Sequence, residues 1–328
     1  MVHALTAVAK ALFVIGLGLL SIESRAQPQP WPTARPVKII CPFATGTSSD
    51  IIIRMIADEM SSIFKQSFVV ENKVGATGMI GAEYVARSAP DGYTLMLTSA
   101  SISGQNLFFF RKVPYDPIKD FTPIGRIAVF PFFLAVKGDS PFSSVSDLVA
   151  YARNPGNKVT YGYAQGTGEI AGAAFVRLAN LQATGVAYKG WPQAWLDLAA
   201  GEYNFAIGDL VSSAPFVKTG RVKFLAVSSG KESKLAPELP PIAKAANLPD
   251  YDVVTWMGFA GPAGIPKDIV EKLSGALNAM LARPAVVQAL KELGVEAAPN
   301  TPAEFASWIQ AQVEVWRVAT QLAGIEPR

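Results

Sequence analysis

The stretch that decides the fold is Val37–Phe64, which reads VKIICPFATGTSSDIIIRMIADEMSSIF. Its first five residues form an apolar run that Pro42 ends, which predicts a buried strand at Val37–Cys41. From about Ser49 to Phe64, apolar residues recur at three- and four-residue spacing, which predicts a helix with one buried face. That face is expected to consist of Ile52, Met55, Ile56, Met60 and Ile63. A strand, a short loop and a helix in this order open an α/β unit.

The same alternation continues along the chain and predicts the fold class. Further strands are expected at 68–71, 93–98, 159–161, 185–188, 205–207, 222–227 and 253–260. Further helices are expected at 79–87, 144–153, 170–181, 193–200, 213–219, 267–281 and from Thr301 onward. We therefore predict an α/β protein whose sheets are mainly parallel and flanked by helices.

The length of the chain, 328 residues, predicts two lobes, because single cores rarely grow beyond about 250–300 residues. Ile124–Val136, an apolar segment broken by Pro131, is the expected first crossover, and Pro237–Pro241 marks the return. The predicted division is a signal peptide at 1–26, a first lobe at 27–130 and 238–328, and a second lobe at 131–237.

The first residues are typical of a cleavable secretory signal. Lys10 precedes the apolar run Ala11–Leu20, and Ser24-Arg25-Ala26 offers small residues for cleavage after Ala26. The run is too short to span a bilayer, and it lacks the polar face that a buried N-terminal helix would show. We expect a periplasmic protein that does not insert into the membrane after cleavage.

Composition argues against several function classes. The only histidine is His3, so the mature chain would have none, which excludes Ser-His-Asp and Cys-His catalysis and makes the usual zinc sites improbable. Catalysis by carboxylates or lysine stays open. Cys41, the only cysteine, is expected as a buried strand thiol. The net charge of +3 comes without a basic run, which argues against nucleic acid as a partner.

Ala44–Asp50 is the first candidate binding loop. It joins a strand end to a helix start, where open α/β sheets place their ligands. Free amides and the positive end of the helix dipole suit a carboxylate there. The alternative is that Ser48, Ser49 and Asp50 only cap the helix, and for Asp50 capping is the favoured interpretation.

Seven segments occur in the order and spacing of a known family. They are Pro42-Phe43 with the loop to Asp50, Glu71–Gly78 (ENKVGATG), Ala89–Leu95 (APDGYTL), Val113–Pro117 (VPYDP), Tyr188-Lys189-Gly190, Trp256-Met257-Gly258 and Gly261–Pro266 (GPAGIP). Together they resemble the Bug-type extracytoplasmic solute receptors of tripartite tricarboxylate transporters. The resemblance runs from about Trp31 to the end of the chain.

This resemblance implies a two-lobed periplasmic-binding-protein fold that closes on a ligand in the cleft between its lobes. It implies a small carboxylate held by amides, hydroxyls and water, and a large and a small membrane subunit as partners. No cofactor, metal or catalysis is implied, and we expect a monomer.

The expected ligand-binding residues follow several strand ends. They are Phe43, Ala44, Thr45, Gly46, Thr47, Ser48, Ser49, Asp50, Ser99, Ala100, Ser101, Gln165, Gly166, Thr167, Gly168, Glu169, Lys189, Gly190, Trp191 and Asp209. Lys189 fits a solvated surface residue equally well, and Trp191 either walls the cleft or staples the helix that it begins.

Departures from the family pattern bear on the ligand. The first loop reads Ala44-Thr45-Gly46-Thr47 where Pro-Pro-Gly-Gly is usual, and the second loop is shorter than usual. Glu169 stands where a histidine is common, and Asp209 where a small hydroxyl residue is common. We hypothesise one ligand carboxylate near Thr45–Ser49 and a donor or cationic group near Glu169 or Asp209.

Two other functions stay open at the level of sequence. A sensory binding protein, which presents its ligand to a membrane signalling partner, needs the same two-lobed trap. A histidine-free periplasmic enzyme on the same scaffold is the other, since a fold does not fix a function.

Overall fold

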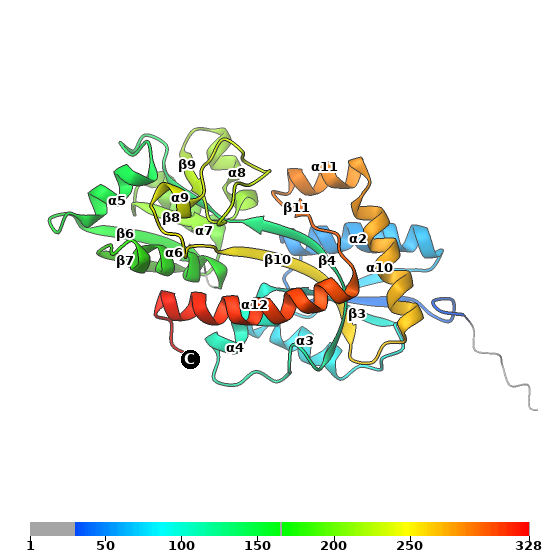
Figure 1. The fold of residues 1–328 in the computed structure, drawn as a ribbon. Coiled ribbons are helices and arrows are strands. Elements are labelled where there is room, and N and C mark those ends of the chain that lie inside the picture. The colour runs from blue at the N-terminus through cyan, green and yellow to red at the C-terminus, as the bar shows by residue number, and fades with distance from the viewer. Residues whose placement is uncertain (1–29, 165, 328) are drawn as a thin grey trace, which may run out of the picture.

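The computed structural model describes residues 30–164 and 166–327. Two sheets follow one another along the molecule, with helices packed on both (Figure 1). The expected signal peptide at 1–26 lies outside the described residues. Among the described helices, none is both long enough and apolar enough to cross a membrane.

The first sheet has six strands in the order β11-β4-β10-β3-β1-β2. These are β1 (Val37–Cys41), β2 (Phe68–Asn72), β3 (Thr94–Ser99), β4 (Phe121–Pro131), β10 (Val254–Pro262) and β11 (Glu296–Ala297). Strand β1 pairs in parallel with β2 and β3, whereas β10 runs antiparallel to β3 and β4, and β11 antiparallel to β4.

The second sheet has five strands in the order β7-β6-β8-β5-β9. These are β5 (Phe133–Lys137), β6 (Val159–Ala164), β7 (Ala183–Tyr188), β8 (Phe205–Gly208) and β9 (Val222–Val227). Strand β6 is parallel to β7 and β8, and β5 is antiparallel to β8 and β9.

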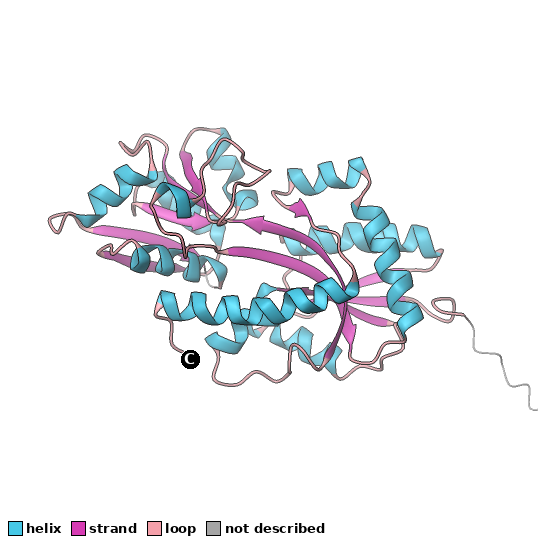
Figure 2. Ribbon diagram, viewed as in Figure 1, coloured by secondary structure: helices cyan, strands magenta, loops and turns pink. Residues whose placement is uncertain are grey.

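In each sheet most strands point the same way, so the α/β class with mainly parallel sheets is confirmed, and β5, β10 and β11 run against the others. Of these three, β5 and β10 enter a sheet directly from the other lobe (Figure 2). A strand that arrives without a crossover helix lacks the right-handed βαβ connection that keeps neighbours parallel.

Helices cover both sheets. The parts of the chain before β4 and after β10 contain α2 (Ser48–Phe64), α3 (Met79–Ala86), α4 (Asn106–Phe109), α10 (Lys267–Leu281), α11 (Pro284–Glu292) and α12 (Pro302–Ala323). The part between β5 and β10 contains α5 (Val145–Arg153), α6 (Thr167–Leu178), α7 (Trp191–Ala200), α8 (Leu210–Lys218) and α9 (Ile242–Ala245). A 3-10 turn η1 (Ala76–Gly78) and a π turn η2 (Ser101–Gln105) complete the elements.

Capping residues at both ends set the bounds of helix α2. The Thr47 side chain accepts a hydrogen bond from Asp50 N at the N-cap, and Lys65 ends the helix in a left-handed conformation with φ 52°. The buried face differs from the expected one, since Met55 is half-buried and Ile63 is exposed. It consists of Ile52, Ile53, Ile56, Ala57 and Met60, together with Asp50.

Helix α12 joins the two sheets into one body. Its Phe305 ring lies 5.6 Å from that of Trp256 on β10, and Gly104 of η2 lies against Trp316. The same apolar core includes Phe175 of α6 and Phe205 of β8. The apolar face of α12 is therefore core packing at Phe305, Ile309 and Trp316, all of them buried.

The return from the second lobe packs with the second sheet. Val227 N donates to Pro240 O, and the Tyr251 hydroxyl donates to Ala171 O of α6. The division of the chain into lobes stays a prediction, and these contacts favour a return near residue 253 over one near residue 238.

Candidate functional site

A cavity of about 570 Å³ lies between the start of α2, from the first half of the chain, and the starts of α7 and α8, from the second. The junction of β4 and β5 and the loop between α11 and β11 close its other sides. It is lined by Gly46, Thr47, Ser48, Ile51, Phe130, Phe132, Gly190, Trp191, Pro192, Asp209, Leu210, Val211, Ser212, Leu293, Gly294 and Val295.

The N-terminus of α2 is the electropositive part of this cavity. Thr47 caps the third helical amide, Asp50 N, over 3.3 Å. The amides of Ser48 and Ser49 precede the first intrahelical bond, and neither donates to an acceptor among the described residues. Two free amides at a helix N-terminus suit an anion.

Asp50 lies beneath this loop and holds its shape. Its carboxylate is 2% exposed and accepts hydrogen bonds from Gly46 N at 3.0 Å, Arg54 Nε at 3.0 Å and Asn72 Nδ2 at 2.8 Å. Asn72 Nδ2 also donates to Phe43 O. The hydrogen bond from Arg54 lowers the pKa of Asp50 to about 2, so the group is an anion at neutral pH. Asp50 positions the loop and does not line the cavity.

Trp191 forms the largest apolar wall. Its ring stacks on Trp195, with centroids 5.2 Å apart, and meets Phe132 edge-on at 5.9 Å. A Cβ atom at either Gly168 or Gly208 would approach the Trp191 ring to 2.5 Å, so glycine at both positions leaves room for the indole. The ring is therefore fixed against the second lobe.

Asp209 is the one titratable side chain among the described lining residues. It caps α8, accepting from Ser212 N over 2.8 Å and from Ser212 Oγ over 2.6 Å. Ser212 Oγ in turn accepts from Trp195 Nε1 over 2.8 Å. Burial raises the pKa of Asp209.

The second predicted loop meets the first lobe outside the cavity lining. Gln105 Nε2 donates to Thr167 Oγ1 over 2.6 Å, and Ser101 Oγ donates to Gln105 Oε1 over 3.0 Å. Gln105 and Thr167 are both buried. The buried Ser99 Oγ has no hydrogen-bond partner in the described part of the chain. Residues 99–101 and 166–169 are thus brought close together by a direct contact between the lobes.

The structure divides the predicted site residues into three groups. Those that line the cavity are Gly46, Thr47, Ser48, Gly190, Trp191 and Asp209. Those that do not line it are Phe43, Ala44, Thr45, Ser49, Asp50, Ser99, Ala100, Ser101, Gly166, Thr167, Gly168, Glu169 and the exposed Lys189. Gln165 lies outside the described residues. Their role as ligand contacts stays a prediction.

Sequence reasoning missed much of the apolar lining. The residues concerned are Ile51, Phe130, Phe132, Pro192, Leu210, Val211, Ser212, Leu293, Gly294 and Val295. The last three follow α11, an element that was not predicted although Pro284 stands at its first position and signals a helix start. Asp209 followed by Ser212 is an N-cap pattern that could have placed α8 correctly.

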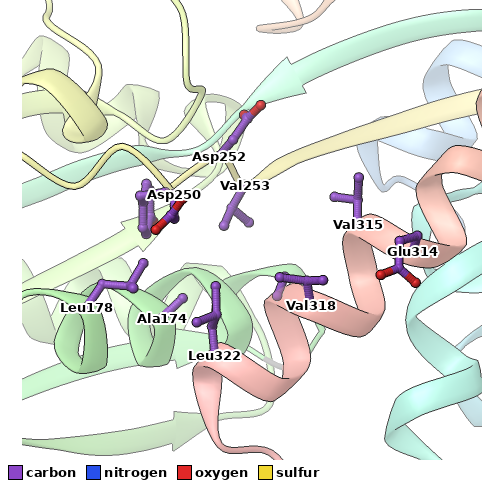
Figure 3. Close-up of a pocket in the computed structure, with 11 residues that line it drawn as sticks. Ala174, Leu178, Asp250, Asp252, Val253, Glu314, Val315, Val318 and Leu322 are labelled. Carbon is purple, nitrogen blue, oxygen red and sulfur yellow. The ribbon is translucent and has the colours of Figure 1, made fainter.

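A second hollow, of about 290 Å³, lies between α6 and α12 (Figure 3). Val318 and Leu322 of α12 contribute its apolar side, opposite Ala174 and Leu178 of α6. Its charged lining residues, Asp250, Asp252 and Glu314, are all acidic, which disfavours an organic anion there. The cavity at α2 is therefore the better candidate for a carboxylate site.

Comparison with known proteins agrees with this geometry. Residues 52–324 match the model of the tripartite tricarboxylate transporter family receptor. A UPF0065 protein from the tcbD-tcbE intergenic region of Pseudomonas sp. (strain P51) is 34% identical over 310 residues, 94% of this chain and 92% of the relative.

Two solved structures share the fold along nearly the whole chain. R. palustris Rpa4515 with adipate has a TM-score of 0.80 at 34% identity, covering 91% of this chain and 100% of that one. The periplasmic binding protein BugD has a TM-score of 0.76 at 30% identity, covering 90% and 99%. The Bug-type resemblance and the two-lobed fold are thereby confirmed, and the chain belongs to the receptor family of tripartite tricarboxylate transporters.

Proposed function

We propose that this receptor captures a small organic acid outside the cytoplasm and delivers it to the large and small membrane subunits of a tripartite transporter. The observation that carries the proposal is the cavity between the two lobes, with the free amide of Ser48 at one end and that of Ser49 next to it in the chain. Rpa4515, which shares the fold, is described with adipate, a carboxylate.

The N-terminus of α2 supplies the grip on the carboxylate. Its two free amides point out of the helix end, where the dipole adds a partial positive charge. The hydroxyls of Thr45, Ser48 and Ser49 are close enough in the sequence to add donors at the same helix end. Because Asp50 fixes Gly46 through a hydrogen bond, the loop is formed before the ligand arrives.

Closure of the lobes completes the site. The second lobe contributes Trp191 and Asp209, and in the described part of the chain two segments connect the lobes, the β4–β5 junction and the segment before β10. Two connections of this kind at one edge act as a hinge in proteins that close around ligands. The ligand is released when the lobes separate.

The proposal includes binding without chemical change. Acid–base catalysis by carboxylates needs a positioned pair of titratable groups, and the lining supplies Asp209 alone. The family to which the chain belongs is a receptor family. Export by the apolar leader belongs to the same proposal, and so does the periplasmic location.

Two substitutions at Ser48 test whether its backbone amide binds the carboxylate. Ser48→Pro removes the backbone donor, and proline is accepted at the first helical position, where Thr47 already has the extended conformation (φ −73°, ψ 160°) that a residue before proline prefers. Ser48→Ala removes only the hydroxyl. We expect calorimetric affinity for the bound acid to fall at least about tenfold more in Ser48→Pro than in Ser48→Ala.

The acid itself is identified by mass spectrometry of small molecules released from gently purified protein. Equal affinities of the two Ser48 variants would contradict the amide grip. Conversion of the released acid to a product on prolonged incubation would contradict binding without chemistry.

A further inference from the structure

We propose that the ligand carries one carboxylate on an apolar body, and that Asp209 excludes acids with a second carboxylate at the far end. This inference rests on the proposed function, because it assigns the first carboxylate to the N-terminus of α2. It departs from the dicarboxylate adipate that is named with Rpa4515.

The walls of the cavity are mostly apolar away from α2. Beyond the α2 end, the cavity is lined mostly by apolar side chains from both lobes, namely Ile51, Phe130, Phe132, Trp191, Pro192, Leu210, Val211, Leu293 and Val295. No lysine, arginine or histidine is among the described lining residues. A second carboxylate would leave water without a cationic partner, which is strongly unfavourable.

Asp209 contributes a carboxyl group to the wall from the second lobe. Ser48, whose amide is free, lines the cavity from the first lobe, so the two residues bound the cavity from opposite lobes. Within the described residues Asp209 makes no ion pair, and both of its oxygens are held by donors of Ser212. A second ligand carboxylate at this wall would meet acceptor oxygens with no cation beside them.

The Asp209 side chain is held in a fixed position. Asp209 is fixed as the N-cap of α8, and Ser212 is fixed in turn by Trp195, which is fully buried. The carboxylate therefore does not swing away when an anion approaches.

The alternative role of Asp209 is to bind an ammonium group of the ligand at the same wall. The apolar walls disfavour this, because an ammonium group also loses its hydration on entry and the two oxygens of Asp209 are already engaged by Ser212. Glu169, the other acid considered at this end, does not line the cavity. The two uses predict different orders of affinity, so one series of ligands separates them.

The test uses three acids with the same six-carbon chain. Hexanoate, adipate and 6-aminohexanoate differ only in the far group, which is a methyl, a carboxylate or an ammonium. Calorimetry on the full mature chain is expected to rank hexanoate first, at least about tenfold tighter than adipate. Adipate binding more tightly than hexanoate overturns the inference and leaves the proposed function standing.

Two further outcomes are equally decisive. The tightest binding by 6-aminohexanoate overturns the apolar-body assignment and makes Asp209 a cation subsite. Failure of all three acids to bind contradicts the proposed function itself, since each carries a carboxylate for the α2 end.

Variants of Asp209 test its part directly. Asp209→Asn keeps a strong N-cap and removes the charge, so the fold of α8 is retained. The hexanoate-to-adipate preference is expected to fall several-fold in Asp209→Asn and in Asp209→Ser. It is expected to stay unchanged in Asp139→Asn, which removes an exposed acid of the same lobe. An unchanged preference in both Asp209 variants would assign the selectivity to the apolar walls and overturn the role of Asp209.

Discussion

Gln105 Nε2 donates to Thr167 Oγ1 over 2.6 Å, which joins the segment after β3 in the first lobe to the start of α6 in the second. Gln105 is 1% exposed and Thr167 is 7% exposed. A buried hydrogen bond between lobes exists only while the lobes are together. It therefore stabilises the closed form relative to an open one, in which water reaches both groups.

Thr167→Val is predicted to shift the protein toward the open form. The Gln105 amide would be left buried without an acceptor for Nε2, at a cost of about 1–3 kcal/mol that an open form does not incur. We expect ligand affinity to fall about tenfold and the radius of gyration in small-angle scattering to rise without ligand. Thr184→Val, the same change at an exposed position of β7, is the control. Equal changes of ligand affinity and radius of gyration in the two variants would show that this hydrogen bond does not stabilise the closed form.

Gly294→Ala is predicted to obstruct closure. A Cβ atom at Gly294 would lie 2.9 Å from Leu210 Cβ of the second lobe, and φ at this glycine is +69°. Gly220→Ala is the matched control, because its φ is +68° and no atom lies within 4 Å of the added carbon. Both variants carry a backbone penalty of about 1 kcal/mol. Only Gly294→Ala is expected to weaken binding by calorimetry, and a similar loss in Gly220→Ala would disprove the steric explanation.

Trp191→Phe is predicted to weaken binding and remove the fluorescence response to ligand. The smaller ring gives up part of the wall between Trp195 and Phe132, which should cost about 1 kcal/mol of binding free energy. Trp308→Phe serves as the comparison, since Trp308 packs under Arg126, with the guanidinium 4.3 Å from the ring centroid, and does not line the cavity. Retention of the full fluorescence change in Trp191→Phe would place the ligand elsewhere.

Asp50→Asn is predicted to remove an acid-sensitive part of the stability. Because the folded-state pKa of Asp50 is lowered to about 2, its carboxylate stabilises the fold above the ordinary pKa near 4. This contribution is lost as the pH falls through about 2. The variant should be about 1–3 kcal/mol less stable at pH 7 and lose less stability than wild type between pH 4 and pH 2.

Urea denaturation at several pH values measures this difference. Asp58→Asn, an exposed position on the same helix, should retain the wild-type pH profile. A wild-type profile in Asp50→Asn would show that another carboxylate carries the acid sensitivity.

Local sequence patterns predict the bounds of several strands and helices correctly. The bounds of β1, β9 and α10 match the predicted ones, because each is an apolar pattern ended by proline, glycine or polar residues. The helices predicted from Ser144 and Thr301 begin with capping boxes at these two residues. The antiparallel placement of β10 was missed, because direction within a sheet depends on which lobe the chain comes from.

The candidate site was predictable mainly at its polar end, with Gly190, Trp191 and Asp209 as the predicted lining residues elsewhere. Thr47 and Ser48 follow from the strand-loop-helix order, which places a helix N-terminus at the sheet edge. The contact of Thr167 with Gln105 joins positions 62 residues apart in the chain, and no local pattern encodes it. The sequence left two roles open for Trp191, a wall of the cleft or a contact that fixes the start of α7. The close approach of Gly168 and Gly208 to its ring shows where the ring packs.

The two ends of the cavity are encoded by different stretches of the chain. The amides at Ser48 and Ser49 belong to the peptide backbone, so most substitutions at those positions keep them. Apart from Ile51, the apolar wall residues lie near residues 130, 191, 210 and 294, on segments remote from α2 in the chain. On the proposed function, point mutations in these segments change the size and polarity of the accepted acid and leave the backbone amides of the α2 end in place.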